Sequence, residues 1–309
     1  MWSFSGSKLF RRCQRQWFYK QRFASALAHD PKRREAYLLS KLQSLYALRG
    51  QIVDDVIGKC LVPSLNHKRT MTLSDCLERA RSLFDSRLDF ARRRAYQEPD
   101  FSMKDAGDSF GALRAIEFGT GISDSEIASA WHDIELALQN LFNMSDVKAR
   151  LHDSSYLRNG DKPLHFESNG VKVRAFPDVV AIYDDKPPLV IDWKVHTFAT
   201  QDYRVQLAIY SIAVAEWFRG ISRNGQDYQA KDIELWEVQL LTNEVRSYLL
   251  TDDDIDDVEA YIAHSAFEIE QAIGSQENKN LVSEDFAVTA YAETCQTCNF
   301  RTICWKESI

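Results

Sequence analysis

Two short stretches decide the fold of this chain: FPDVV at residues 176–180 and VIDWK at residues 190–194. Each is a run of apolar residues that carries one aspartate, which is typical of a buried strand with a charge near its end. Asp192 lies fourteen positions after Asp178, and the turn-forming residues 184–188 stand between them. We therefore expect two antiparallel neighbouring strands that bring both aspartates to one end of a sheet.

The patterns on either side of these stretches predict strands flanked by helices, that is, an α/β or α+β core. Asn169-Gly170 is typical of a tight hairpin turn. One of Asp252, Asp253 and Asp254 is expected to cap the last long helix. The expected strands are residues 163–168, 171–176, 178–183, 189–195, 233–241 and 244–250; the expected helices are residues 7–23, 35–61, 202–219 and about 252–272, and residues 70–160 are expected to be mainly helical.

The aspartates and a neighbouring lysine form a pattern that suits phosphodiester hydrolysis. Asp192 and Lys194 are two positions apart on one expected strand, so their side chains share a face. Paired carboxylates bind Mg²⁺ or Mn²⁺, and such an ion activates water and neutralises charge on a phosphate. We expect Asp178 and Asp192 as metal ligands, the Val195 carbonyl as a further ligand, and Lys194 as the electrostatic and water-positioning group.

An Asp-x-Lys pattern alone is usually a surface ion pair. Here Asp192 follows the apolar residues 189–191, where a charge is costly without a partner or a metal. Gln206 and Tyr210 are an i, i+4 pair that could hold the nucleic-acid backbone or the lysine. Asp54 could reach the same metal from an upstream helix. Taken alone, Gln206 and Tyr210 fit an ordinary helix face equally well, and Asp54 fits a solvent-facing position better.

The charge of the chain is unevenly distributed. The net charge is −7, which argues against a general polyanion binder, but residues 1–50 hold eleven Lys or Arg and two acids. A cationic region beside an acidic site is what a metal-dependent nuclease needs, because phosphates must be attracted while a metal is held. The sequence contains no apolar stretch long enough for a membrane span and no secretory signal, so we expect a cytoplasmic protein without a membrane partner.

Three cysteines lie close together near the end of the chain, at Cys295, Cys298 and Cys304. In a reducing compartment such clustering indicates a metal site, for which a fourth ligand would be needed. The spacing alone leaves zinc and an iron–sulfur cluster open. The other cysteines are Cys13, Cys60 and Cys76.

These motifs together resemble the PD-(D/E)XK nuclease superfamily, in its RecB/AddB-like and CRISPR-associated exonuclease-like branch. Asp178, then Asp192-Trp-Lys194, then Gln206-x-x-x-Tyr210 correspond to its motifs. Residues 50–54 resemble the branch's Gly-x-x-x-His motif, except that Asp54 replaces the histidine. Ala175 and the pair Val195-His196 also depart from the family pattern. The resemblance covers both ends of the chain and residues 170–215, and leaves residues 62–160 unmatched.

The resemblance implies a restriction-endonuclease-like core, a mixed central sheet flanked by helices with a helical insertion. It also implies that Cys13, Cys295, Cys298 and Cys304 bind a [4Fe–4S] cluster, and that Asp54 stands in as a metal ligand. Such a cluster would be a clasp joining the two ends of the chain. A zinc-stabilised version of the same nuclease is the alternative.

The expected function is an Mg²⁺- or Mn²⁺-dependent deoxyribonuclease acting on single-stranded DNA or DNA ends. The alternative is a catalytically inactive DNA-binding or scaffolding subunit that keeps the fold and the clasp. The chain has no nucleotide-binding P-loop, so any helicase, ATPase or defence-complex subunit must be a separate partner. We expect a single domain, divided into residues 1–61 (basic helices with Cys13), 62–160 (helical insertion), 161–250 (catalytic core) and 251–309 (last helix and clustered cysteines).

Overall fold

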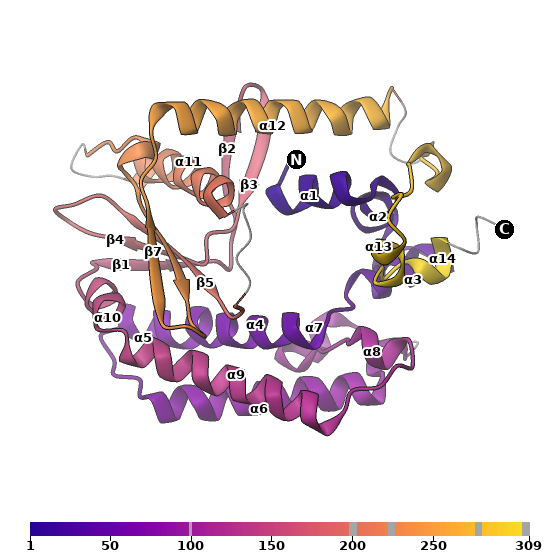
Figure 1. The fold of residues 1–309 in the computed structure, drawn as a ribbon, viewed down its shortest axis with the longest axis horizontal. Coiled ribbons are helices and arrows are strands. Elements are labelled where there is room, and N and C mark those ends of the chain that lie inside the picture. Colours follow the sequence, from indigo (N-terminus) through magenta and orange to yellow (C-terminus); the bar gives the residue numbers. More distant parts are fainter. Residues whose placement is uncertain (99–100, 198–202, 222–225, 276–279, 305–309) are drawn as a thin grey trace.

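A five-stranded mixed sheet forms the centre of the computed structural model, which describes residues 1–98, 101–197, 203–221, 226–275 and 280–304. The strand order is β1-β4-β5-β6-β7, and only the β5–β6 pair is parallel (Figure 1). The strands are β1 (Tyr156–Asn159), β4 (Val179–Ile182), β5 (Leu189–Lys194), β6 (Glu234–Gln239) and β7 (Glu244–Tyr248). This mixed sheet flanked by helices confirms the predicted fold class.

Strands β4 and β5 are buried on both faces of the sheet, and their alternating side chains pack into two different cores. Ile191 and Val179 pack into the first core, whereas Val190 and Val180 pack into the second. Because side chains alternate along a strand, Asp192 lies on the same face as Val190. That face is the one covered by helix α11 (Tyr203–Ile221).

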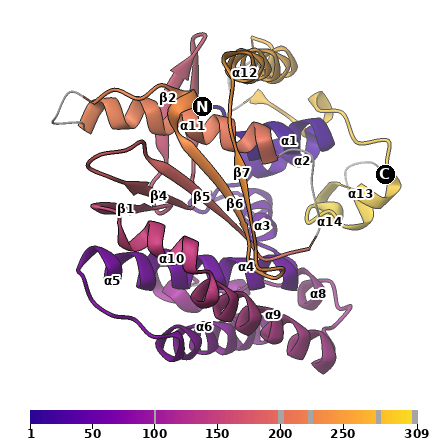
Figure 2. The same ribbon diagram turned by 60° about the vertical axis from the view of Figure 1, so that its left-hand side comes forward.

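The first core is covered by helices that precede the sheet in the sequence. The views of Figures 1 and 2 agree that these helices form one layer beneath the sheet. Capping boxes fix the starts of two of them, at Thr72 and at Ser123. The helices of this layer are α4 (Leu45–Val56), α5 (Val62–Asn66), α6 (Leu73–Arg93), α9 (Asp124–Asn143) and α10 (Ser145–His152), with the π-helical segment Ile57–Leu61 between α4 and α5.

The second core lies between the sheet, α11, α12 (Asp252–Ile273) and a separate hairpin. The hairpin pairs β2 (Leu164–Ser168) with β3 (Val171–Ala175). Its turn residues have positive φ, 49° at Asn169 and 77° at Gly170, as a tight turn of the expected kind requires.

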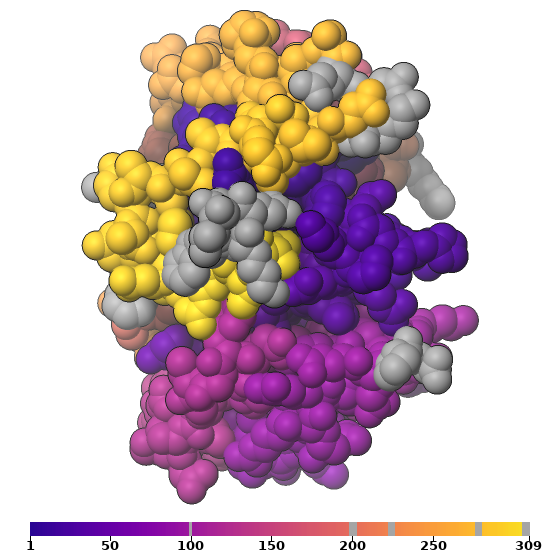
Figure 3. All heavy atoms as spheres, turned by 90° about the vertical axis from the view of Figure 1, so that its right-hand side faces the viewer, coloured from indigo at the N-terminus to yellow at the C-terminus, as the bar shows by residue number. Residues whose placement is uncertain are grey.

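The two ends of the chain pack together in a third core. Phe18 stacks on Phe286 with 4.9 Å between ring centroids, and Tyr19 stacks on Phe300 at 5.6 Å. Figure 3 shows the N-terminal and C-terminal segments side by side on one face. The elements of the third core are α1 (Phe4–Arg12), α2 (Gln14–Phe18), the π-helical segment Tyr19–Phe23, α3 (Pro31–Ser40), α7 (Met103–Ala106), α8 (Arg114–Glu117), α13 (Ala292–Gln296) and α14 (Arg301–Cys304), with short 3₁₀ turns at Ala95–Gln97, Gly107–Ser109 and Ser283–Asp285. A further 3₁₀ turn, Ala230–Asp232, borders the second core.

Several expected elements differ in their details. The helix expected at residues 7–23 is broken at Cys13, whose backbone is extended and whose thiol caps α2. The helix expected at residues 35–61 is broken before Ser44, which caps α4. Strand β1 lies in a stretch expected to be mainly helical, and the cap of α12 is Thr251 rather than one of the three aspartates.

The helix expected at residues 202–219 corresponds to α11, but its expected first residue, Asp202, lies outside the described residues. None of the described helices combines the length and the apolar character that crossing a membrane requires.

Candidate active site

Asp178 and Asp192 lie together at one end of the central sheet. Strands β4 and β5 are antiparallel, so the residue before β4 lies beside the end of β5. The Trp193 N–H donates a hydrogen bond to Asp178 Oδ2 at 2.9 Å, which ties the first aspartate to the second strand. Asp192 is 2% exposed. The structure therefore brings together the two carboxylates that the sequence singled out.

Lys194 faces the same site. Its ammonium forms an ion pair with Asp192 and lies 4.9 Å from the centre of the Tyr203 ring. Burial disfavours the ammonium, but the charge and hydrogen bond of Asp192, together with the charges of Asp178 and Tyr203, outweigh that effect and raise the pKa of Lys194. Lys194 therefore remains a cation, held beside the carboxylates.

Asp54 approaches the two aspartates from helix α4. It lines a cavity of about 710 Å³ together with Asp178, Asp192, Lys194 and Gln206. Asp54 stays accessible through this open cavity, whereas the neighbouring Asp55 pairs with Lys59 and Arg87 instead. Asp54 is therefore the aspartate of this helix that faces the cavity.

The charge of Asp192 opposes the ionisation of both Asp178 and Asp54. Burial raises the pKa of Asp178 well above its ordinary value, and the charges of Asp192 and Asp54 raise it further. Burial also raises the pKa of Asp192, although Lys194 acts against this shift. Desolvation, followed by the charges of Asp55 and Asp192, raises the pKa of Asp54 to about 6. Such a cluster stabilises positive charge placed among its members.

The donor set fits a hard divalent cation, because three carboxylates supply oxygen ligands of the kind that Mg²⁺ and Mn²⁺ prefer. In the described part of the chain, however, no three His, Cys, Asp or Glu side chains are placed as a group that could hold a metal ion. One oxygen of Asp192 pairs with Lys194 and one of Asp178 accepts the Trp193 N–H. Side-chain adjustment would be needed for all three carboxylates to share an ion.

The expected fourth ligand, the Val195 carbonyl, is engaged elsewhere. It accepts a hydrogen bond from Arg49 Nη2 at 2.6 Å, and the same guanidinium forms an ion pair with Asp133. This hydrogen bond uses one of the two lone pairs of the oxygen, so Val195 stays a predicted ligand. Arg49 was not expected, and it joins α4 and α9 to the end of β5.

Gln206 and Tyr210 lie on one face of α11, as their spacing predicts. Gln206 Nε2 is 2.8 Å from the Tyr210 hydroxyl and 3.3 Å from Asp192 Oδ1. The Gln206 amide thus contacts Asp192, and the expected role of Gln206 and Tyr210 in holding the nucleic-acid backbone or Lys194 stays a prediction. The position of Gln206 suits orientation of the Asp192 carboxylate.

Three residues near the site escaped the sequence analysis. The Tyr203 ring lies beside the Lys194 ammonium, and the Tyr203 hydroxyl is 2.8 Å from His196 Nε2. Glu237 is fully buried on β6, directly beside Asp192, and accepts hydrogen bonds from Tyr248 and Gln239. Glu237 could have been noticed in the sequence, because it is an acid inside an expected apolar strand.

The four predicted cluster cysteines also converge. Cys13, Cys295, Cys298 and Cys304 line one small cavity together with Tyr19, although Cys13 lies 282 to 291 residues before the other three cysteines. Burial raises the pKa of the Cys298 thiol to about 11. Four thiols are suitable donors for an iron–sulfur cluster and for zinc alike.

Replacing Asp54 by asparagine is expected to stabilise the protein in the presence of a chelator at pH 8. A carboxyl whose pKa is raised on folding binds its proton more tightly in the folded state than in the unfolded chain. Its ionisation therefore lowers stability as the pH rises from about 4 through about 6. Asp54→Asn removes this penalty, so its melting temperature should exceed that of wild type at pH 8 and match it at pH 4.

Thermal unfolding in EDTA from pH 4 to pH 8 measures this difference. Asp256→Asn, which neutralises an exposed acid on α12, is the control and should show no such trend. An Asp54→Asn protein that is no more stable than wild type at pH 8 would contradict the proposed repulsion.

Comparison with known proteins gives one family match. A model of the PD-(D/E)XK nuclease superfamily matches residues 1–305. Two similar solved structures are the protein SSO0001 (16% identity, 62% of this chain and 80% of that chain covered, TM-score 0.27) and a candidate exonuclease from Eubacterium rectale (11% identity, 88% and 93% covered, TM-score 0.34). Likenesses this weak carry no argument about fold or activity. No curated protein matches the chain.

Proposed function

The chain belongs to the PD-(D/E)XK nuclease superfamily, and from this premise we propose that it is a DNA nuclease that depends on Mg²⁺ or Mn²⁺. The observation that carries the proposal is the convergence of Asp54, Asp178, Asp192 and Lys194 on one cavity. An acidic cluster with a single ammonium is suited to holding a cation and a phosphate together. A purely structural ion pair would not need the two additional carboxylates.

The chain's own side chains supply distinct parts of this chemistry. Asp54, Asp178 and Asp192 would hold the ion, which supplies Lewis acidity and an activated water. The Lys194 ammonium stabilises negative charge that develops on the phosphate oxygens. Gln206 orients Asp192, and the Tyr203 ring positions the ammonium of Lys194.

We further propose that the substrate is single-stranded DNA or a DNA end. Tyr46 lines the active-site cavity and is 72% exposed, while Arg49 lies 5.1 Å from the centre of its ring. An exposed aromatic ring beside the carboxylates offers a stacking surface to a base that has left the duplex. Bases inside a duplex are already stacked on each other and would not use it.

Replacing Tyr46 by alanine is expected to raise the KM for single-stranded DNA about tenfold, because stacking of one base on an aromatic ring contributes roughly 1–3 kcal/mol. An oligonucleotide with abasic sites lacks the base, so its KM should be the same for both proteins. Steady-state cleavage of the two substrates measures this, with Tyr156→Ala as a control at an exposed tyrosine on β1. An equal loss on abasic DNA would rule out stacking.

We assign the chain to the RecB/AddB-like branch and propose that its four convergent cysteines bind a [4Fe–4S] cluster as a clasp in a reducing compartment, the cytoplasm. The convergence of residues from both ends on one cavity supports this clasp. A brown protein whose iron content matches four atoms per chain is expected. A colourless protein with one bound zinc would replace the iron–sulfur assignment with the zinc alternative.

The alternative function is an inactive DNA-binding subunit, favoured by one observation: among the described residues, no three His, Cys, Asp or Glu side chains are placed as a group that could hold a metal ion. Either form of the protein would act with a separate helicase, ATPase or defence-complex subunit.

An anaerobic assay on end-labelled single and double strands separates these functions. The proposal expects cleavage with Mg²⁺ or Mn²⁺ and none in EDTA, with the single strand preferred. DNA binding without cleavage across these metals would support the inactive subunit instead.

A further inference from the structure

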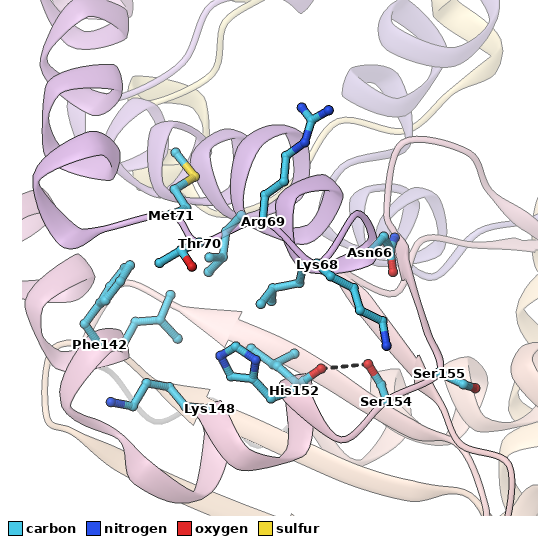
Figure 4. A pocket seen from close by; sticks show the side chains of 14 residues that line it. Asn66, Lys68, Arg69, Thr70, Met71, Phe142, Lys148, His152, Ser154 and Ser155 are labelled. Atoms are coloured by element: carbon cyan, nitrogen blue, oxygen red, sulfur yellow. Dashed lines mark hydrogen bonds between the residues drawn. The ribbon is translucent and has the colours of Figure 1, made fainter.

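A second cavity lies within the helical layer, away from the carboxylates. Its volume is about 270 Å³, and it is bounded by α5, α10, the end of α9 and the loop between α5 and α6 (Figure 4). None of its lining residues lines the active-site cavity. Its apolar surface comes from Leu61, Leu65, Met71, Leu141, Phe142 and Leu151.

The rim of this cavity is cationic. Lys68 and Lys148 lie on opposite sides with His152 between them, whereas the Arg69 side chain points away (Figure 4). No Asp or Glu is among the lining residues, although the chain has 45 acids and a net charge of −7. Among the described residues, neither lysine has an ion-pair partner. The two ammonium groups are therefore available to an anion.

The loop that carries Lys68 is held in place by the backbone. The N–H of Lys68 donates to the Leu65 carbonyl at 2.9 Å, and the N–H of Arg69 donates to the Ser64 carbonyl at 2.8 Å. Next to them, the Asn66 side chain bonds both the N–H and the carbonyl of Leu157, at 2.8 and 2.7 Å. The rim is thus organised before any ligand arrives, which lowers the entropy lost on binding.

We propose that this cavity binds a small amphipathic anion, a molecule with an apolar body and one carboxylate or phosphate group. The leucines and Phe142 would remove the apolar body from water, while Lys68 and Lys148 would pair with the charged head. A neutral molecule of the same shape would leave the ammonium groups without a partner. The inference does not depend on the proposed nuclease function.

The position of the cavity connects it to the active site. Leu61 and Leu65 belong to the same continuous helical run as Asp54, and Leu61 follows Asp54 by seven residues. This spacing corresponds to roughly 10 Å along a helix. A ligand in the cavity would therefore contact the helix that carries one of the three carboxylates.

Isothermal titration of the whole protein tests this site with chosen probes. Decanoate combines an apolar body with a carboxylate, and decanol is its neutral match. The deoxynucleotide dTMP presents a phosphate on a more polar body. We expect one molecule of decanoate or dTMP per chain with a Kd below about 1 mM, which corresponds to about −4 kcal/mol. Decanol and inorganic phosphate should bind at least tenfold more weakly.

Two variants assign the binding to this cavity. Lys148→Ala and Lys68→Asn should each weaken it at least tenfold, whereas Lys162→Ala, an exposed lysine outside the cavity, should not. Asparagine is chosen because φ at position 68 is 53°, a region that asparagine tolerates better than alanine. Unchanged melting temperatures show that both variants remain folded.

The outcomes are distinct. Tighter binding of dTMP points to a nucleotide ligand, and tighter binding of decanoate points to an acyl carboxylate. No binding of either, equal binding of decanol, or binding that survives both substitutions would overturn the proposal. Nuclease activity is not a readout, so failure here is separate from failure of the proposed function.

Discussion

Replacing Lys194 by alanine is expected to lower the rate of DNA hydrolysis by about a hundredfold or more, as loss of a group that stabilises transition-state charge commonly does. Lys194 is the cation placed directly against the carboxylates, through its ion pair with Asp192. Without it, charge that develops on the phosphate loses its nearest protein counter-charge. The loss should appear in kcat, because this interaction is strongest in the transition state.

Single-turnover cleavage of a labelled single strand at saturating Mn²⁺ measures this effect. Lys172→Ala removes the same charge from an exposed position on β3 and should cleave like wild type. Because Lys194 is nearly buried, its removal also leaves Asp192 without a counter-charge, so the melting temperature of each variant must be recorded. A folded Lys194→Ala protein that cleaves at the wild-type rate would defeat the assignment of this residue.

Replacing Cys298 by serine is expected to remove the cluster and to destabilise the fold. Cys298 shares its cavity with Cys13 from the opposite end of the chain, so a cluster at this point closes nearly the whole chain into a loop. By analogy with disulfide loops, such closure contributes at most about 5 kcal/mol. We expect the brown colour to disappear and the unfolding midpoint to fall substantially.

Iron content, visible absorbance and anaerobic thermal unfolding report on this change. Cys60→Ser is the matched control, because Cys60 lies on the helical layer and outside the cysteine cavity. If Cys298→Ser keeps both the colour and the stability of wild type, Cys298 is not a ligand and the clasp must be abandoned.

The sheet could be predicted from the sequence because its local and distant signals agree. The apolar alternation around Asp178 and Asp192, and the turn between them, specify two antiparallel strands that lie where expected. The hairpin at Asn169 follows from turn chemistry alone. Where strand propensity, the pattern of apolar residues and the turn residues all favour one structure, tertiary packing rarely changes it.

The missed elements depend on contacts between distant residues. The break at Cys13 has no proline or glycine to mark it, and the extended backbone there directs the thiol toward cysteines almost 300 positions away. Strand β1 is only four residues long and is stabilised by pairing with β4 and by Asn66. Such signals are absent from a local window of sequence.

In the candidate site, too, some contacts could be predicted from the sequence and others could not. Asp178, Asp192 and Lys194 could be placed together from strand geometry, because residues two apart on a strand share a face. The engagement of the Val195 carbonyl could not, because its partner Arg49 lies 146 residues away. The contact of Gln206 with Asp192 rather than Lys194 likewise depends on how α11 crosses the sheet.

The most direct test of the metal site is the binding of Mn²⁺ itself, followed by electron paramagnetic resonance of the free ion. The account predicts that the wild-type protein binds at least one Mn²⁺ per chain and that Asp192→Asn binds it at least tenfold more weakly. If the variant and the wild-type protein take up Mn²⁺ equally, or if neither does, these carboxylates do not form the metal site.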